Sequence, residues 1–254
     1  QGAALATVIA EYATLLIGLL MVRKVLRLRG VSLVMLRQAW RGNFRRLLAL
    51  NRDIMLRSLL LQLCFGAITV LGARLGSDII AVNAVLMTLL TFTAYALDGF
   101  AYAVEAHSGQ AYGARDGSQL LEVWRAACRQ SGIVALLFSV VYLLAGEQIV
   151  ALLTSLPQIQ QLADRYLLWQ VILPLVGVWC YLLDGMFIGA TRAAEMRNSM
   201  AVAAAGFALT LLALPVLGNH GLWLALAVFL TLRGLSLAWI WRRHWRNGTW
   251  FSAS

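Results

Sequence analysis

The sequence contains few of the residues that hold metals, form disulfides or perform hydrolysis. It has 3 cysteines and 3 histidines among 254 residues. Cys64, Cys128 and Cys180 fall in or beside apolar stretches without paired spacing, so we interpret them as small buried side chains. The histidines form no cluster with Asp or Glu at metal-ligand spacing. We therefore expect no catalytic residue, no metal and no cofactor, and we predict that the protein is not an enzyme.

Charged residues are also scarce. They make up 13% of the chain, whereas hydrophobic residues make up 61% and the mean hydropathy is +0.77, outside the range of soluble globular domains. The apolar residues gather into seven stretches, each close to the roughly 20 residues that a helix needs to cross the hydrocarbon core. The stretches are Gly2–Val22, Ile54–Gly72, Ile79–Val104, Ala126–Gly146, Tyr166–Gly189, Ser199–Leu217 and Gly221–Trp241. We expect an all-α polytopic membrane protein with seven transmembrane helices, whose solvent is membrane lipid.

The basic residues are distributed unevenly over the joins between the stretches. If the join after the first stretch is cytoplasmic, alternation of the helices places 18 of the 21 Lys and Arg residues on that side. Arg74 and Arg165 fall on the other side, and Arg233 lies within the last stretch. This bias is the positive-inside pattern, and it predicts a multi-pass protein with a cytoplasmic C-terminus. Because the charges sit at helix ends, they indicate membrane topology and no nucleic-acid partner.

The joins also suggest how the chain is divided. The longest join, 23–50, is rich in Arg and has apolar residues at roughly helical spacing, as a basic amphipathic helix on the inner leaflet would have. We expect a first transmembrane helix at 1–22, a cytoplasmic basic linker at 23–50, a six-helix lobe at 51–246 and a cytoplasmic tail at 247–254. The chain begins without an initiator Met or a secretory signal, so we expect it to start in the middle of a larger protein.

Several of the stretches, among them the first with Glu11, carry polar residues at steps of three and four, which places these residues on one side of a helix. On the third stretch these residues are Thr88, Thr91, Tyr95, Asp98, Tyr102 and Glu105. On the fifth they are Gln170, Pro174, Gly177, Tyr181 and Asp184. An ionised carboxylate in hydrocarbon costs several kcal/mol, so the stripes are expected to face each other or a water-filled cavity. For the small and hydroxylated residues, close packing of helices explains the pattern equally well.

The acids of these stripes are the candidates for binding a transported cation. Asp184 is the first candidate and Asp98 the second. The expected pathway-lining residues are Tyr95, Tyr181, Gln170 and Glu11, of which Glu11 lies in the first stretch. Pro174 removes a backbone hydrogen bond, so the fifth stretch is expected to bend around Asp184.

Arg233 lies near the middle of the last stretch, too deep to reach the membrane surface easily. We expect it to line the pathway and to pair with Asp184, Asp98 or Glu11. A permanent pair would keep that carboxylate ionised and make it a poor proton carrier. Arg57 stands close to the start of its stretch, and we expect it to extend its side chain to the cytoplasmic surface.

One run of residues resembles a known transporter family. The segment 99–114, which ends in Gly109-Gln110-Ala111-Tyr112-Gly113-Ala114, is similar to the end of a core helix in the multidrug and toxic compound extrusion (MATE) transporters. The segment 50–59, and Asp184 followed by residues 189–192, resemble a branch of that family found in enterobacteria. The resemblance implies a bacterial inner-membrane protein of twelve helices in two six-helix lobes. This chain would supply the last helix of the first lobe and the complete second lobe, with the N-terminal lobe as its missing partner.

The resemblance also implies an activity. Members of the family exchange H⁺ or Na⁺ for amphipathic, often cationic, small molecules by alternating access, so the coupling ion is transported and is not a cofactor. An acid in the tenth helix takes part in coupling in some members, and Asp184 is its expected counterpart. Two alternatives stay open: a flippase for an amphipathic lipid-linked substrate, and a membrane subunit that transports nothing.

Overall fold

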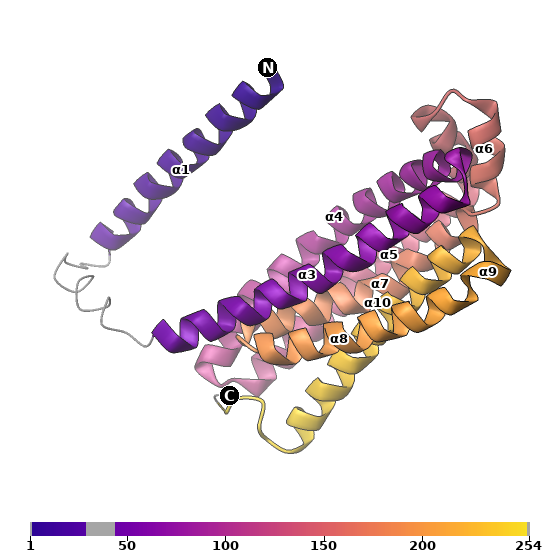
Figure 1. Cartoon of the computed structure of the whole chain (residues 1–254). Helices are drawn as coiled ribbons and strands as arrows, with labels where there is room; N and C mark the ends of the chain where they lie inside the picture. Colours follow the sequence, from indigo (N-terminus) through magenta and orange to yellow (C-terminus); the bar gives the residue numbers. More distant parts are fainter. Residues whose placement is uncertain (1, 29–43, 253–254) are drawn as a thin grey trace. The chain divides into compact units, whose positions relative to one another are not determined.

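The computed structural model describes residues 2–28 and 44–252, and over these ranges the chain is helical without strands (Figure 1). Within these ranges, seven helices are long and apolar enough to cross a membrane, which agrees with the predicted number. They span Leu5–Arg27, Leu47–Leu75, Ser77–Ala114, Gly117–Leu153, Leu167–Gly189, Ala193–Leu217 and Asn219–Arg246. Each of them overlaps one of the predicted stretches, so the all-α, seven-helix prediction holds.

The chain divides into two compact units, Gln1–Leu48 and Ala49–Ser254. The first contains α1 (Gly2–Leu28), whose apolar side chains are exposed along its length and which carries Glu11. Helix α1 continues beyond the predicted 1–22, and α3 begins at Phe44, so both helices reach into the segment assigned to the linker. The remainder of that linker, 29–43, lies outside the described residues, and with it most of the predicted amphipathic helix.

The second unit is a helical bundle. Its elements are α3 (Phe44–Leu75), of which Ala49 onward belongs to this unit, α4 (Ser77–Ala114), α5 (Gly117–Leu153), α6 (Pro157–Asp164), α7 (Leu167–Gly189), α8 (Ala193–Thr210), a 3₁₀ turn η1 (Leu211–Ala213), α9 (Leu214–Leu217) and α10 (Asn219–Arg246). Consecutive long helices run in opposite directions, so that α3, α5 and α8 begin, and α4, α7 and α10 end, at one end of the bundle (Figure 1). We call this end the basic end, because Arg115, Arg192, Arg197 and Arg242 lie there.

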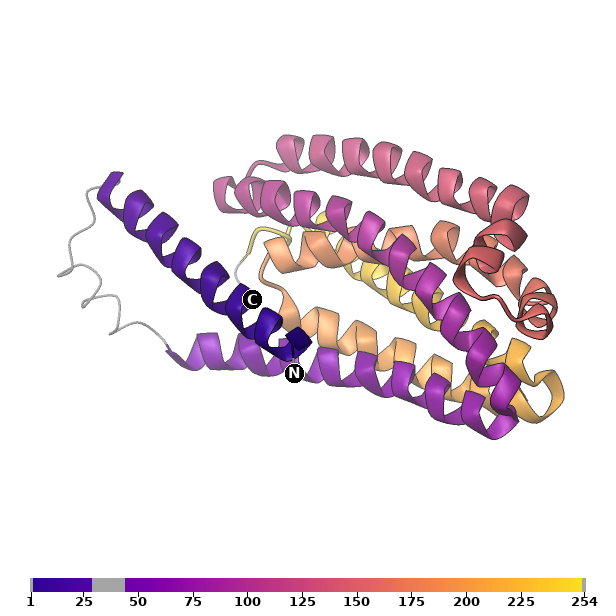
Figure 2. The same ribbon diagram turned by 90° about the horizontal axis from the view of Figure 1, so that it is seen from above.

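Helix α7 organises the packing. It contacts α4 and α5 as well as α10, and α10 in turn packs on α8 (Figure 2).

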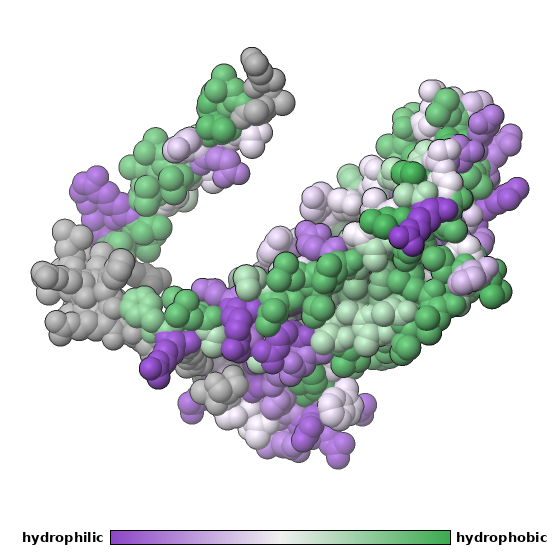
Figure 3. Space-filling view, viewed as in Figure 1, coloured by the Kyte–Doolittle hydropathy of each residue, from purple (hydrophilic) through white to green (hydrophobic). Residues whose placement is uncertain are grey.

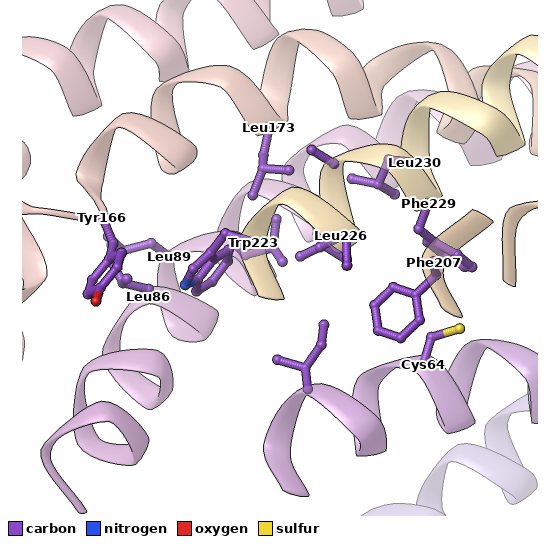
Figure 4. Packing of buried hydrophobic residues seen from close by; sticks show 14 of the residues in the cluster. Cys64, Leu86, Leu89, Tyr166, Leu173, Phe207, Trp223, Leu226, Phe229 and Leu230 are labelled. Carbon is purple, nitrogen blue, oxygen red and sulfur yellow. The ribbon is translucent and has the colours of Figure 1, made fainter. Parts of the chain in front are cut away.

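The buried hydrophobic residues form two clusters. One, around Trp223, Phe229 and Leu86, lies towards the start of α10 (Figure 4). The other, around Phe187 and Leu182, lies towards the basic end.

Glycines let α7 approach α4 closely. A Cβ atom on Gly189 would lie 2.6 Å from the carbonyl oxygen of Glu105 and 2.9 Å from the amide nitrogen of Gly109. A Cβ on Gly185 would overlap the carbonyl group of Ala101 in the same way. Real Cβ atoms do not come this near to backbone atoms, so only glycine fits at this crossing. The small residues of the fifth predicted stretch thus serve helix packing at its end.

The connection between α4 and α5 is a tight turn at the basic end. Asp116 caps the N-terminus of α5 by accepting hydrogen bonds from the Ser118 hydroxyl at 2.6 Å and from the backbone amides of Ser118 and Gln119. These hydrogen bonds, that of the Ser118 hydroxyl first, hold the pKa of the Asp116 carboxyl below its usual range. The turn therefore closes the α4–α5 hairpin with a charged cap.

The C-terminal segment folds back onto the bundle. Arg192 is buried and donates hydrogen bonds to the carbonyl oxygens of Thr249, at 2.9 Å, and Trp250, at 3.0 Å. Trp250 is 1% exposed, and its ring packs against Phe187 with the centroids 5.2 Å apart. The guanidinium carbon of Arg192 lies 4.9 Å from the centre of the same ring. Residues 247–252 of the predicted tail are thus part of the bundle's packing.

Candidate functional site

The centre of the candidate site is a buried carboxylate held by two arginines. Asp184 lies on α7 and is 6% exposed. Arg57 of α3 donates a 2.8 Å hydrogen bond from Nη2 to its Oδ2. Arg233 of α10 forms an ion pair with the same oxygen. Three helices thus meet at one carboxylate within the membrane-spanning part of the unit.

The pairing of Arg233 with an acid is confirmed, and Asp184 is its partner among the acids considered.

The interpretation of Arg57 as a residue that extends to the membrane surface is wrong. Its side chain is 17% exposed and turns inward to Asp184, because the attraction between opposite charges is strong where water is excluded. The sequence shows both residues, but only the fold places Arg57 opposite Asp184.

The second acid, Asp98, differs from the first. It lies on α4 and is partly exposed. Within residues 2–28 and 44–252, no ion pair or side-chain hydrogen bond engages its carboxylate, although it lies within electrostatic range of Arg57 and Arg233. Two carboxylates and two guanidinium groups together carry no net charge. A cation added at Asp98 leaves the group with one positive charge.

The two polar stripes point in different directions. On α4, Tyr95 is 73% exposed, and Tyr102 is exposed as well, so this stripe forms an outer face of the bundle. On α7, Gln170 and Asp184 are buried inside it. The stripes approach each other at Asp98 and at the partly buried Tyr181, whose ring lies within electrostatic range of Asp98.

The predicted site residues therefore do not all gather in one place. Asp98, Asp184, Tyr181 and Arg233 lie together, and Tyr95 lies on the exposed α4 face beside them. Gln170 is 14 positions before Asp184 on the same helix, about 21 Å away at 1.5 Å per residue. It is 1% exposed and its Nε2 has no hydrogen-bond partner. Glu11 belongs to the separate unit of α1.

A second ion cluster lies nearer the basic end. Asp53 of α3 is 6% exposed and accepts hydrogen bonds from Arg197 of α8, at 2.6 Å, and from the neighbouring Arg52. Asp53 and Arg57 are four positions apart, so they share one face of α3. This face is fastened to α8 by one ion pair and to α7 by the other. In the sequence, the four-residue spacing of Asp53 and Arg57 marks a charged face on this helix, but it does not reveal the partners on α7 and α8.

Within residues 2–28 and 44–252, no three His, Cys, Asp or Glu side chains come together as metal ligands. His244 instead faces Glu195 at 2.8 Å, and Arg192 approaches the same Glu195 oxygen at 2.7 Å.

Known proteins with similar sequences point to one family. The MatE family model matches residues 54–217, which cover most of the bundle. DNA damage-inducible protein F of Escherichia coli (strain K12) is 91% identical over all 254 residues of the chain. The chain spans 55% of the length of that relative.

Solved structures agree on the fold. A MATE protein crystallised in a bent conformation has a TM-score of 0.69 at 17% identity, over 78% of this chain and 45% of that one. An outward-facing multidrug resistance MATE transporter of the MOP superfamily has a TM-score of 0.69 at 16% identity, over 82% of this chain and 48% of that one. A MOP superfamily transporter from Pyrococcus furiosus, described with a binding pocket of reverse polarity, has a TM-score of 0.70 at 17% identity, over 85% of this chain and 50% of that one. The chain belongs to the MatE family of transporters.

Proposed function

We propose that the complete protein is a cation-coupled multidrug efflux antiporter, driven by H⁺ or Na⁺ and working by alternating access. Family membership supports transport, and the charge arrangement around Asp184 supports cation coupling. Its substrates would be amphipathic, cationic small molecules. The similarity to an Escherichia coli protein favours the inner membrane of a bacterium. The location of the basic residues favours an orientation with the basic end and the C-terminus in the cytoplasm.

The proposal rests on one observation, the pairing of both Arg57 and Arg233 with Asp184, while the second acid, Asp98, has no ion pair among the described residues. Taken as one group, these four side chains carry no net charge. Asp184 is already paired with two guanidinium groups, so a proton or Na⁺ that bound its carboxylate would have to displace them. We therefore reverse the order of the two acids: Asp98 exchanges the coupling cation, and Asp184 positions the arginines. When Asp98 binds H⁺ or Na⁺, the group becomes positive and repels a cationic substrate. When Asp98 releases the cation, the substrate can bind beside it.

The exposed face of α4 has a place in this proposal. Asp98 lies at the inner edge of a face that carries Tyr95 and Tyr102, both more than half exposed. Aromatic rings suit amphipathic cations, because their faces attract positive charge. We propose that this face meets a first, N-terminal lobe across the substrate pathway, and that exchange at Asp98 changes the preferred arrangement of the lobes. Coupling requires that cation and substrate favour different states.

Drug flux in proteoliposomes of the complete protein tests the proposal, with H⁺ and Na⁺ gradients imposed separately. We expect one gradient to drive export of a cationic dye, Asp98→Asn to abolish the driven component, and Thr91→Val, on the same exposed face, to leave it intact. Failure of both gradients to drive any flux in the unaltered protein would exclude a cation-coupled antiporter.

A flippase for an amphipathic lipid-linked substrate is the second candidate. Arg57 and Arg233 place two guanidinium groups inside the membrane, which is the chemistry that an anionic headgroup requires. Both groups face Asp184, which favours the antiporter. Movement of a lipid-linked substrate across the same proteoliposomes, without a response to either gradient, would favour the flippase. A membrane subunit that transports nothing would show neither flux.

A further inference from the structure

Two neighbouring hollows lie along α10, one polar and one apolar. The polar hollow has a volume of about 480 Å³ and lies at the basic end between α8, α10 and the returning C-terminal segment. Its lining includes Arg243, His244, Asn198 and Asn247. The apolar hollow has a volume of about 380 Å³ and lies deeper in the membrane-spanning part, between α10, α7 and α5. Neither hollow contains a residue of the candidate site.

One stripe of α10 joins the two hollows. Leu235 lines the apolar hollow, while Trp239 and Arg243 line the polar one. The three residues are spaced by four positions, so they follow one another along one side of the helix. Leu235 is 62% exposed and Trp239 is 63% exposed. A molecule lying along this stripe would contact the apolar hollow at one end and a cation at the other.

We propose that this stripe binds one phospholipid with an anionic headgroup. The phosphodiester lies in the polar hollow, where it accepts hydrogen bonds from Arg243, and an acyl chain lies along Leu235 into the apolar hollow. The proposal is independent of the transport function. Basic pockets between transmembrane helices on the cytoplasmic side are a recurrent way to bind anionic headgroups. In the proposed orientation, the lipid belongs to the inner leaflet.

The position of Arg243 suits this role. Its guanidinium carbon lies 5.6 Å from the centre of the Trp239 ring, so the side chain lies over the indole at the level expected for the membrane interface. Its charge has no carboxylate partner within 4 Å among the described residues. The phosphate of a lipid would provide the missing counter-charge, and Trp239 would hold the guanidinium in place.

The acid in the polar hollow does not oppose an anion. Glu195 lines the hollow, but its Oε1 lies 2.7 Å from Arg192 and 2.8 Å from His244. Its charge is therefore balanced by Arg192. Arg242, one position before Arg243, and Arg246, on the last turn of α10, add positive charge to this end. The surroundings thus favour an anionic headgroup over a zwitterionic one.

Lipid titration of the complete, delipidated protein tests the proposal, with bound lipid counted by native mass spectrometry. We expect phosphatidylglycerol to bind more tightly than phosphatidylcholine, and Arg243→Gln to weaken its binding about tenfold, as loss of a charged hydrogen bond would. Arg242→Gln removes the same charge from an exposed neighbour that does not line the hollow, and should weaken binding less than about twofold.

Two further measurements distinguish a bound lipid from a smaller bound anion. Trp239→Leu removes the ring beneath Arg243 and should also weaken binding of phosphatidylglycerol. Inorganic phosphate should not compete with the lipid, because it lacks the acyl chain that the apolar hollow takes. Equal effects of Arg242→Gln and Arg243→Gln would overturn the proposal, since they would show diffuse attraction to a basic surface. Efficient competition by inorganic phosphate, or equal binding of the two lipids, would overturn it as well.

Discussion

Arg57 and Asp184 are 127 positions apart in the chain, and the guanidinium of one donates a 2.8 Å hydrogen bond to the carboxylate of the other. Arg233 pairs with the same carboxylate from a third helix. Removing a charge from water is costly, so ions buried in this way are stable only as a set. The set ties α3, α7 and α10 together inside the membrane, and its members depend on one another.

Asp184→Asn should therefore destabilise the complete protein by about 3 kcal/mol, because it leaves the buried Arg233 without a counter-charge. Arg57→Gln should cost less, since Asp184 keeps Arg233 and the Arg57 side chain is the more exposed of the two arginines. Unfolding of the purified protein by increasing fractions of SDS in mixed micelles measures both free energies.

The double variant Asp184→Asn/Arg233→Gln provides the control. If the two residues form a pair, the second substitution removes the unpaired charge, and the double variant should be at least about 1 kcal/mol more stable than the sum of the single effects predicts. Additive losses would contradict the pairing.

Asp98 should be reachable by water, whereas its neighbour Leu97 should not be, because Leu97 is 1% exposed. In a background in which Cys64, Cys128 and Cys180 are replaced by serine, Asp98→Cys should react with a water-soluble maleimide at least about tenfold faster than Leu97→Cys, which reacts only after local opening. The measurement is the labelling rate in membranes. A thiol at position 98 that stays unlabelled would contradict a hydrated passage beside this acid.

The sequence was sufficient for the parts of the fold that depend on hydropathy. Seven spans follow from seven apolar stretches, because the bilayer sets the length of a helix that crosses it. The 3.6-residue period showed that Asp98 and Tyr95 share a side of α4, but not whether that side faces outward. Which side of α4 faces outward depends on the helices that pack against it, and the residues of the stripe do not specify those helices.

Arg57 shows a second limit. Near the start of a span, an Arg has two ways to satisfy its charge: the membrane surface, or a carboxylate inside the bundle. The sequence around Arg57 is compatible with both. The choice is made by the position of Asp184 on a helix more than a hundred residues later, and no local pattern contains it.

The glycine crossing between α7 and α4 makes a further prediction. Gly189→Ala would place a methyl group 2.6 Å from the carbonyl oxygen of Glu105, and the helices would have to separate. Overpacking of this kind should cost about 1–3 kcal/mol. Gly132→Ala is the matched change, because a Cβ there meets no atom within 4 Å. It should leave stability unchanged or raise it by up to about 1 kcal/mol, since alanine favours helix. Equal midpoints of SDS unfolding for the two variants would argue against the crossing.

The C-terminal segment has a different structural role from the one predicted from its sequence. Residues 247–254 are predicted to be a cytoplasmic tail, and within this segment Trp250 is buried against Phe187 and Arg192. Trp250→Ala should lower the free energy of unfolding by about 3 kcal/mol, through loss of the buried ring and the cavity left behind. Ser252→Ala keeps the backbone carbonyls that Arg192 contacts and should have little effect. Limited proteolysis adds a local readout: only Trp250→Ala should let the end of α10 unravel, so that trypsin cleaves after its arginines. Rapid cleavage there in the unaltered protein would show that the segment is not held against the bundle.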